Sequence, residues 1–288
     1  MLLNGILDKK ETVVSKIHDV CVVGLGACGM TASLYCVRGG YSVIGVEKLL
    51  LGGQLFEIES LENFPSFSGK GSELANRMEE QLTQYENFTL MYDEVTRVRK
   101  SFNGDYYEVE LMLEEPILAR GVIIANGTKP RELPILKGFD NVHYCALCDG
   151  SLYSNANLVV LGGGNSAYSE ALYLRGLGND VTVAYRGTNP RAEKCLMDRA
   201  FRKGIRTVLN FDTTDVIGEK PMLELLVSGE SMLSCDGVFV AVGRETEDSF
   251  YNGLRIDDRV VVANDGDQVV TACAKGAEAG IRMMRILG

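Results

Sequence analysis

The sequence lacks several features on which whole classes of proteins depend. No stretch of about 18 apolar residues occurs, so no segment is long enough to cross a bilayer as a helix. Lys and Arg number 29 against 39 Asp and Glu, and neither sign forms a long run. Nucleic acid is therefore disfavoured as a partner, because phosphates are bound by clustered Lys and Arg. The net charge of −10 also argues against attachment to an anionic membrane.

The N-terminal segment and the cysteines both favour a cytoplasmic location. Residues 1–17 lack the basic start and apolar middle of a signal peptide. Six of the eight cysteines lie in apolar or mixed surroundings and are expected to be small buried hydrophobic side chains: Cys21, Cys28, Cys36, Cys195, Cys235 and Cys273. We therefore expect a cytoplasmic protein with mostly free thiols. Its 288 residues, 46% of them hydrophobic, suffice for about two domains with a large core.

Cys145 and Cys148 are the two cysteines with a functional spacing. A CxxC pair forms a dithiol that opens and closes as a disulfide, and Asp149 follows it at once. Half of a zinc site has the same spacing, but there is no second pair, and His18 and His143 are the only histidines. We therefore expect no metal site. Because a dinucleotide-binding fingerprint lies on each side of the pair, the arrangement predicts an electron relay.

The first fingerprint is a GxGxxG turn that runs from Gly24 through Gly26 and Ala27 to Gly29. A predicted strand at residues 18–23 precedes it, a predicted helix at residues 30–38 follows, and a second strand at residues 41–46 ends at Glu47. Gly24 permits the tight turn, Gly26 the approach of a pyrophosphate, and Gly29 the packing of helix on strand. Glu47 is placed to accept hydrogen bonds from ribose hydroxyl groups. This context predicts an adenine dinucleotide site.

The second fingerprint, a GxGxxA turn, departs from that pattern after its second strand. The turn consists of Gly162, Gly163, Gly164, Asn165, Ser166 and Ala167, between a strand at residues 158–161 and a helix at residues 168–175. The next strand, residues 180–184, is followed by no acid; Arg186 and Arg191 stand there instead. Two interpretations remain open. The arginines bind the 2′-phosphate of NADPH, or they are solvated charges on a unit that has lost its nucleotide.

Five ordered motifs together resemble those of the low-molecular-weight thioredoxin reductases, from about Asp19 to Met284. The motifs are Gly52–Leu55 with Glu62–Pro65, Ala125–Gly127, Tyr144–Gly150 with Leu147 in place of Thr, Gly162–Ala167, and Gln268–Ala272. The resemblance implies FAD as cofactor, thioredoxin as partner and a homodimer. For FAD it implies these residues: Gly24, Gly26, Ala27, Gly29, Glu47, Gly53, Gln54, Asn63, Ala125, Gly127, Asp265, Gln268 and Val269. NADPH, if it binds, would use Gly162, Gly164, Asn165, Ser166, Ala167, Arg186 and Arg191.

The expected fold class is α/β, with two Rossmann-like, three-layer nucleotide-binding domains. The FAD-binding domain is expected to be discontinuous, built from residues 1–126 and 243–288. The domain that carries the dithiol occupies residues 127–242. Polar segments at residues 128–130 and 243–246 lie between apolar strands and are predicted hinges.

Two departures from the family pattern affect the electron donor and the flavin site. The family's HRRxxxR signature for NADPH appears as Tyr185–Arg191, without the His and one Arg. The segment of residues 253–266 is too short to contain both the family's β-hairpin and the segment with its flavin-binding Asp. Asp265 is the possible counterpart of that Asp. In these respects the chain is similar to the ferredoxin-dependent flavin thioredoxin reductases, so reduced ferredoxin is the favoured donor and NADPH the alternative. Residues 283–287 are expected to complete the flavin site.

The resemblance also implies roles for the dithiol and its neighbour. Electrons would pass from FAD to the disulfide through Cys148, and Cys145 would attack the disulfide of thioredoxin before Cys148 resolves the mixed disulfide. Asp149 would act as general acid and base, although a turn residue before Gly150 is the alternative interpretation. From another functional class, a redox-sensing flavoprotein without turnover would use the same dithiol as a switch.

Overall fold

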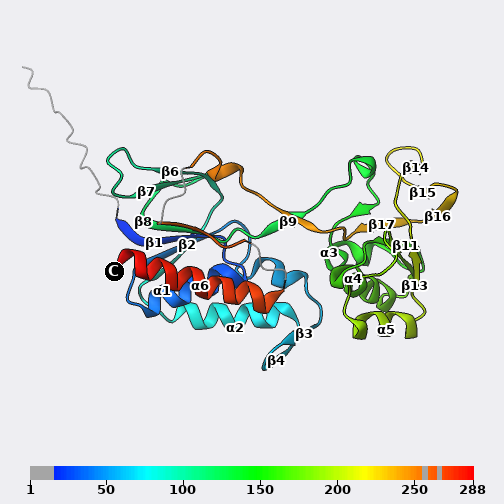
Figure 1. Cartoon of the computed structure of the whole chain (residues 1–288), viewed down its shortest axis with the longest axis horizontal. Helices are drawn as coiled ribbons and strands as arrows, with labels where there is room; N and C mark the ends of the chain where they lie inside the picture. Colours follow the sequence, from blue (N-terminus) through cyan, green and yellow to red (C-terminus); the bar gives the residue numbers. More distant parts are fainter. Residues whose placement is uncertain (1–15, 255–258, 265–267) are drawn as a thin grey trace, which may run out of the picture.

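The computed structural model describes residues 16–254, 259–264 and 268–288. It has two lobes joined by a narrow neck (Figure 1). The helices are α1 (Ala27–Arg38), α2 (Gly71–Thr83), α3 (Ala146–Asp149), α4 (Asn165–Gly176), α5 (Lys194–Arg202) and α6 (Val269–Leu287), with 3-10 turns η1 (Gly53–Glu57), η2 (Pro134–Leu136), η3 (Gly150–Leu152) and η4 (Ser249–Tyr251). Within the described residues, none of these helices has the length and apolar character needed to cross a membrane.

The first lobe is built on a sheet in the order β5-β2-β1-β8-β7-β6, with β19 paired to β8. The strands are β1 (Ile17–Val23), β2 (Val43–Glu47), β5 (Phe88–Tyr92), β6 (Val95–Lys100), β7 (Tyr107–Leu111), β8 (Ile117–Ile124) and β19 (Val260–Val262). Strands β5, β2, β1, β8 and β19 are parallel, whereas β6 and β7 pair antiparallel. Because β19 and α6 follow the second lobe in sequence, the first lobe contains both ends of the described chain.

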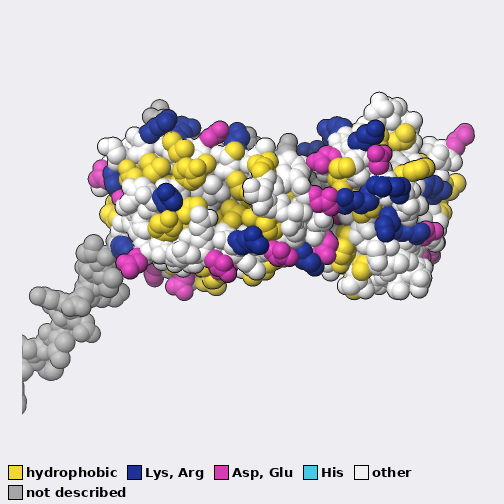
Figure 2. Space-filling view, turned by 90° about the horizontal axis from the view of Figure 1, so that it is seen from below, with side chains coloured by type: hydrophobic (Ala, Val, Ile, Leu, Met, Phe, Trp, Pro, Cys, Tyr) yellow, Lys and Arg dark blue, Asp and Glu magenta, His cyan; other side chains and the backbone are white. Residues whose placement is uncertain are grey.

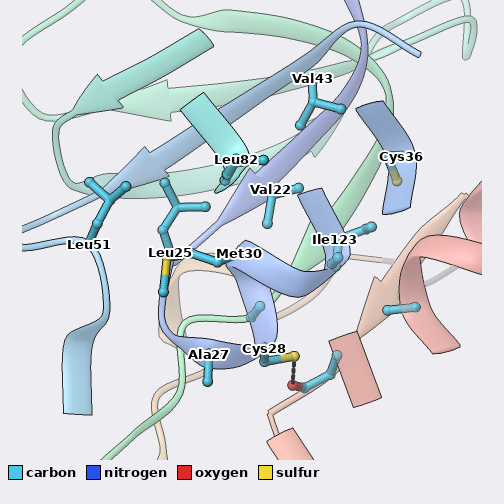
Figure 3. Packing of buried hydrophobic residues seen from close by; sticks show 14 of the residues in the cluster. Val22, Leu25, Ala27, Cys28, Met30, Cys36, Val43, Leu51, Leu82 and Ile123 are labelled. Atoms are coloured by element: carbon cyan, nitrogen blue, oxygen red, sulfur yellow. Dashed lines mark hydrogen bonds between the residues drawn. The ribbon is translucent and has the colours of Figure 1, made fainter. Parts of the chain in front are cut away.

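Helices α1 and α6 pack against each other beneath this sheet because glycines on α6 let the two backbones meet. A Cβ atom at Gly276 would lie 2.1 Å from the Cys28 carbonyl oxygen, and one at Gly280 would lie 2.9 Å from that of Ala32. Val22, Leu25 and Met30 belong to the apolar core above them (Figure 3). The Cys28 thiol donates to the Ala263 carbonyl oxygen at 3.1 Å, drawn dashed in Figure 3, which ties the first glycine turn to the segment after β19.

The second lobe has a five-stranded parallel sheet in the order β10-β17-β11-β12-β13. Its strands are β10 (Val142–His143), β11 (Asn157–Leu161), β12 (Asp180–Tyr185), β13 (Arg206–Leu209) and β17 (Gly237–Val240). Helices α4 and α5 pack on one face of the sheet. A three-stranded sheet of β14 (Asp215–Ile217), β15 (Leu225–Ser228) and β16 (Ser231–Ser234) packs on the other. Both lobes therefore have the predicted strand, turn, helix, strand order of a Rossmann-like α/β fold.

The neck is a two-stranded antiparallel ribbon of β9 (Thr128–Pro130) and β18 (Arg244–Thr246), the two segments predicted as hinges. Arg244 fixes the ribbon to η1 because its guanidinium donates to Thr128 and lies 3.2 Å from Glu57 Oε2. A small hairpin of β3 (Leu61–Phe64) and β4 (Phe67–Gly69) projects below the first lobe, at the end nearer the second lobe (Figure 1). The chain thus crosses between the lobes twice, at one place.

Two expectations from the sequence are wrong. Residues 283–287 form the last turns of α6, where Met283 packs against Gly121 and Tyr41 donates to the Met284 carbonyl oxygen, whereas α6 begins at the opposite end beside the glycine turns. This tail therefore completes no cofactor site. Cys195 is exposed and Cys273 half-buried, in contrast to the buried Cys21, Cys28, Cys36 and Cys235. Cys195 is exposed because it stands in the first turn of α5, in the wall of an open cavity.

Candidate functional site

The first glycine turn has the geometry expected of a dinucleotide cradle. Gly24 adopts φ +86°, and a Cβ atom there would lie 2.6 Å from the Ala125 carbonyl oxygen. A Cβ atom at Gly29 would lie 1.8 Å from the Gly24 carbonyl oxygen, so only glycine lets α1 approach the strand this closely. Among the described residues, the Gly52 carbonyl oxygen at 3.8 Å is the one atom within 4 Å of a Cβ placed at Gly26, and Gly26 lines an open cavity. The turn therefore leaves room for a pyrophosphate beside the N-terminus of α1.

Glu47 ends β2 at the edge of this cradle. One carboxylate oxygen accepts a hydrogen bond from the Leu25 backbone N–H at 2.8 Å, and the other accepts from Leu49 N–H at 3.0 Å. These bonds hold the side chain over the turn, in the wall of the cavity. Each carboxylate oxygen keeps a further lone pair, so Glu47 is able to accept from ribose hydroxyl groups as well.

A single cavity of about 1630 Å³ connects the two glycine turns and the dithiol. Most of the predicted site residues line it: Gly24, Gly26, Ala27, Glu47, Gly53, Gln54, Asn63, Ala125, Gly127, Cys145, Cys148, Gly162, Gly164, Asn165, Ser166, Arg186, Arg191, Gln268 and Val269. Gly29 and Ala167 instead pack inside the turns. Asp149 lies behind the dithiol, and Asp265 lies outside the described residues. The cavity is large enough for an extended dinucleotide, and its glycines fit one.

Cys145 and Cys148 form a disulfide in the wall of this cavity. Cys145 is half-buried before the first residue of α3, and its sulfur accepts a hydrogen bond from the Cys148 backbone N–H at 3.1 Å. Cys148 is exposed. Helix α3 contacts η1 of the first lobe, so the disulfide lies where the two lobes face each other. Both sulfurs are therefore within reach of a ligand in the cavity.

Asp149 belongs to a three-residue network that the sequence alone did not reveal. Its Oδ2 lies 3.3 Å from Nδ1 of the buried His143, and Nε2 of that ring lies 2.7 Å from the Tyr153 hydroxyl. The imidazole stacks on Phe239 at 5.0 Å between ring centroids. Burial, and then the charge of Asp149, raises the pKa of Tyr153, so its hydroxyl keeps its proton. The contact with His143 holds the Asp149 carboxylate beside the dithiol. In the sequence, the signal for this network was His143, two positions before the CxxC pair.

Glu170 on α4 is a second side chain that the sequence analysis did not single out. It lines the cavity, and its Oε2 is buried without a hydrogen-bond partner in the part of the chain that the structure describes. Burial, with a smaller contribution from Glu57, raises the pKa of Glu170 to about 8, while Arg244 opposes the shift. Below that pH the side chain is a neutral carboxylic acid that faces the space between the lobes.

The substitution E170Q is expected to stabilise the protein increasingly as the pH rises. The carboxyl binds a proton up to pH about 8 in the folded protein but only up to about 4.5 in the unfolded chain. Unfolding therefore releases a proton between these values, and the stability of the wild type falls as pH rises through that window. We expect E170Q to gain on the order of 2 kcal/mol at pH 8.5, about 5 °C in Tm, and little at pH 5.

Thermal unfolding at pH 5, 7 and 8.5 measures this difference. The variant E80Q, at an exposed glutamate on α2, controls for loss of one negative charge. A gap in Tm between wild type and E170Q that is the same at all three pH values would show that Glu170 is ionised throughout.

The second glycine turn is partly covered by the chain's own side chains. The Tyr185 ring lies against Gly163, where a Cβ atom would approach it to 2.4 Å. At the N-terminus of α4, Asn165 donates to the Glu193 carboxylate at 2.9 Å, and the Glu193 backbone N–H donates back to Asn165 at 2.7 Å. A carboxylate thus occupies the end of the helix that favours negative charge. Arg186 and Arg191 are exposed at the rim of the same cavity.

Polar contacts hold the two lobes together on the side of α5. The two terminal nitrogens of the Arg199 guanidinium donate to the two carboxylate oxygens of Glu62, in the β3–β4 hairpin, each at 2.8 Å. Hydrogen bonds from Arg199 and then Ser60 lower the pKa of Glu62 to about 2. Asn63 donates to Glu193 at 3.2 Å and to Gln268 at 2.9 Å. These contacts hold the lobes in the arrangement that encloses the cavity.

Comparisons with known proteins agree with this geometry. The family model for pyridine nucleotide-disulphide oxidoreductase matches residues 18–272. The thioredoxin reductase of Bacillus subtilis (strain 168) is 32% identical over 240 residues, 79% of this chain and 75% of that protein. The 34.2 kDa protein in the rubredoxin operon of Clostridium pasteurianum is 31% identical over 245 residues, 81% of this chain and 78% of that protein. The crystal structure of Lactococcus lactis thioredoxin reductase, in its FR conformation, has a TM-score of 0.87 at 28% identity, with 94% of this chain and 99% of that chain covered.

Proposed function

Because the chain belongs to the pyridine nucleotide-disulphide oxidoreductase family and is of the thioredoxin reductase type, we propose that it is a flavoprotein that reduces the disulfide of a thioredoxin. One observation carries this proposal: the Cys145–Cys148 disulfide and the first glycine turn line a single cavity of about 1630 Å³. A dithiol there is able to accept electrons from a bound cofactor and then to pass them to a protein disulfide. We assign residues 1–126 and 243–288 to the cofactor-binding domain and residues 127–242 to the domain that carries the dithiol.

FAD is the dinucleotide that we propose for the first glycine turn. Gly24, Gly26 and Ala27 would hold its pyrophosphate at the N-terminus of α1, and Glu47 would bind its ribose. Gln54, Asn63 and Val269, farther along the cavity, would lie beside the ring system. When bound, FAD supplies the two electrons that open the Cys145–Cys148 disulfide.

The dithiol then transfers those two electrons to the substrate by thiol–disulfide exchange. The Cys145 thiolate attacks one sulfur of the thioredoxin disulfide, which forms a mixed disulfide and releases one substrate thiolate. The Cys148 thiolate attacks the Cys145 sulfur, which releases the second substrate thiolate and restores the Cys145–Cys148 bond. Two protons taken up by the substrate thiolates complete the reduction.

Asp149 is the group that we propose for these proton transfers. It follows Cys148 directly, and His143 holds its carboxylate through the contact of 3.3 Å between Nδ1 and Oδ2. When protonated, the carboxyl donates to a leaving thiolate; when ionised, it accepts the proton of an attacking thiol. His143 acts as a positioning residue in this scheme, since it touches Asp149 rather than the sulfurs.

The same dithiol must face FAD in one step and a protein disulfide in the next, which requires motion. We propose that the lobe carrying the dithiol rotates about the β9–β18 ribbon, the one place where the chain crosses between lobes. Rotation would break the Arg199–Glu62 and Asn63–Glu193 contacts. These are exposed polar contacts, which contribute little to stability and therefore allow an arrangement to open.

For the electron donor we propose reduced ferredoxin, which would deliver two electrons one at a time. The second glycine turn supports this choice because Tyr185 covers Gly163 and the Glu193 carboxylate stands at the N-terminus of α4, where a phosphate would be repelled. The clostridial relative is a protein of a rubredoxin operon, and this association of a similar chain with rubredoxin also favours a protein donor.

NADPH is the second candidate donor, favoured by one observation. Arg186 and Arg191 are exposed and line the cavity together with Gly162, Gly164 and Asn165. Two guanidinium groups beside a glycine turn are able to bind the 2′-phosphate of a pyridine nucleotide. This version requires the Glu193 carboxylate to swing away from Asn165 when the nucleotide binds.

Anaerobic stopped-flow spectroscopy separates the two donors. Oxidised protein is mixed either with an excess of NADPH or with reduced ferredoxin, and the flavin absorbance near its maximum is followed. We expect bleaching on the timescale of turnover with ferredoxin and none with NADPH. Rapid bleaching by NADPH, lost in R186A/R191A, would establish the second candidate instead. Catalytic reduction of thioredoxin also separates the enzyme from a redox-sensing flavoprotein. The homodimer and the cytoplasmic location expected from the sequence stay predictions.

A further inference from the structure

We propose that the exposed face of α5 and its flanking loops docks an acidic electron-carrier protein, with Phe201 as the apolar anchor. This inference rests on the proposed function, because it locates where a protein donor binds. The α5 face is defined as the six exposed basic residues Arg186, Arg191, Lys194, Arg202, Lys203 and Arg206 together with Phe201.

Charge sets this surface apart from the rest of the molecule. Residues 186–206 contain seven Lys and Arg but two Asp and Glu, in a chain whose net charge is −10. Figure 2 shows the basic side chains gathered across the lobe that carries α5, beside the cleft between the lobes. Acidic side chains also lie along the cleft in this view, with some basic ones among them. An acidic partner is therefore attracted to one region and repelled by most of the remaining surface, which orients it.

The basic groups of the α5 face are available to a partner. Within the residues that the structure describes, Arg199 forms an ion pair with Glu62, whereas the six exposed basic residues form none. Arg202 and Arg206 make single hydrogen bonds to the Asp198 carbonyl oxygen and the Thr182 hydroxyl, which leaves most of their N–H groups free. A partner with carboxylates would therefore gain ion pairs without breaking existing ones.

Phe201 gives the face an apolar centre. Its side chain is 81% exposed, and Arg202 and Lys203 follow it directly in the sequence. It borders a small hollow lined by Tyr168, Met197, Ile205 and Arg206. An exposed aromatic ring beside a hollow and surrounded by arginine has the composition of an interface hot spot rather than of ordinary solvated surface.

The α5 face is also correctly placed for electron entry. Cys195, Leu196 and Arg199, on the inner side of α5, line the cavity, so the helix forms part of its rim. The Arg199–Glu62 ion pair joins α5 to the β3–β4 hairpin of the first lobe. A protein seated on the α5 face would therefore extend from Phe201 to the rim of the cavity, which Arg186 and Arg191 line. Its binding would also favour the lobe arrangement in which that ion pair is closed.

The test is the binding of oxidised, acidic bacterial ferredoxin to the FAD-loaded protein, measured by calorimetry at low and moderate salt. The variant R202E/K203E/R206E reverses three charges outside the cavity, and F201S removes the anchor. A matched control, R38E/R97E/R282E, reverses three exposed arginines on the first lobe. We expect Kd to rise at least tenfold for R202E/K203E/R206E with a flatter salt dependence, about tenfold for F201S at every salt concentration, and little for the control.

Melting temperatures and flavin content of all variants establish that they fold. A second measurement, the reduction of thioredoxin by each variant after chemical reduction with dithionite, is expected to match the wild type. If that reduction works but both α5 variants bind ferredoxin with the wild-type Kd, the docking inference is wrong and the proposed function stands. If α5 variants lose thioredoxin reduction instead, the face binds the substrate, which also overturns the inference. If the wild type reduces no thioredoxin, the proposed function itself has failed.

Discussion

The substitution C148S is expected to abolish turnover and to convert the protein into a trap for its substrate. Without Cys148, the Cys145 thiol is still able to attack the substrate disulfide, but nothing resolves the mixed disulfide that forms. The rate of thioredoxin reduction should therefore fall at least about 10⁴-fold, since no other side chain replaces a missing nucleophile. A covalent adduct of one enzyme chain with one thioredoxin, released by dithiothreitol, should appear on a non-reducing gel.

The substitution C145S tests the order of attack. It should lose as much activity but form no adduct, although Cys148 is the more exposed sulfur in this arrangement of the lobes. C195S is the matched control, because Cys195 is also exposed and lines the same cavity but forms no disulfide in the described structure. An adduct formed by C145S and not by C148S would reverse the assignment of the two sulfurs. Full activity in either variant would remove the dithiol from the reaction altogether.

The fold was accessible from the sequence because its signals are local. Each glycine turn stands directly between a β-branched strand and a helix, and the predicted strands at residues 18–23 and 158–161 each differ from β1 and β11 by one residue. Both helices begin earlier than predicted, at Ala27 and Asn165, because the last residues of a fingerprint already belong to the first turn of the helix. The hinges were also local signals, although their pairing as a ribbon was not.

The parts of the site that were missed depend on contacts between distant segments. Glu170 is one of several polar residues on a helix, and only the approach of the second lobe to Glu57 and Arg244 makes it a buried carboxylic acid. Glu193 meets Asn165 across 28 positions, and Arg199 meets Glu62 across 137. Neither spacing nor composition predicts such pairs. The basic α5 face was missed for a different reason: its charges lie within residues 186–206, but other residue types separate most of them, and they share one surface only when α5 and its flanking loops fold.

The second lobe has a partly covered glycine turn and also basic residues at the rim of the cavity. Its packing gives a physical reason for this combination. If no pyridine nucleotide binds the second turn, the lobe retains it for structural reasons: Gly162 and Ala167 still pack α4 onto β11. Its surface is then free to take another role, and the loop that would meet NADPH carries Arg186 and Arg191 into the α5 face instead. A glycine fingerprint therefore specifies how a helix packs on a strand more strongly than it specifies a ligand.

The substitution D149N is expected to lower kcat for thioredoxin reduction by about 10²- to 10³-fold while the KM for thioredoxin changes little. Asparagine keeps the shape of the side chain and its contact with His143 but neither binds nor releases a proton, so each leaving thiolate must take its proton from water. The flavin spectrum and the Cys145–Cys148 disulfide should be unaffected. Steady-state rates with thioredoxin, driven by chemical reduction with dithionite so that the donor is not involved, measure the effect.

The substitution H143N separates positioning from proton transfer. The imidazole is enclosed by Asp149, Tyr153 and Phe239, and Asp236 and Cys235 act on Tyr153 from the neighbouring segment. Its loss leaves the Asp149 carboxylate free to rotate, so we expect kcat to fall about tenfold, less than in D149N, while the KM for thioredoxin changes little. Y153F removes the hydroxyl that bonds to the ring and should lower kcat by a smaller factor. Wild-type kcat in H143N would remove the positioning role of His143, and wild-type kcat in D149N would place the proton source elsewhere.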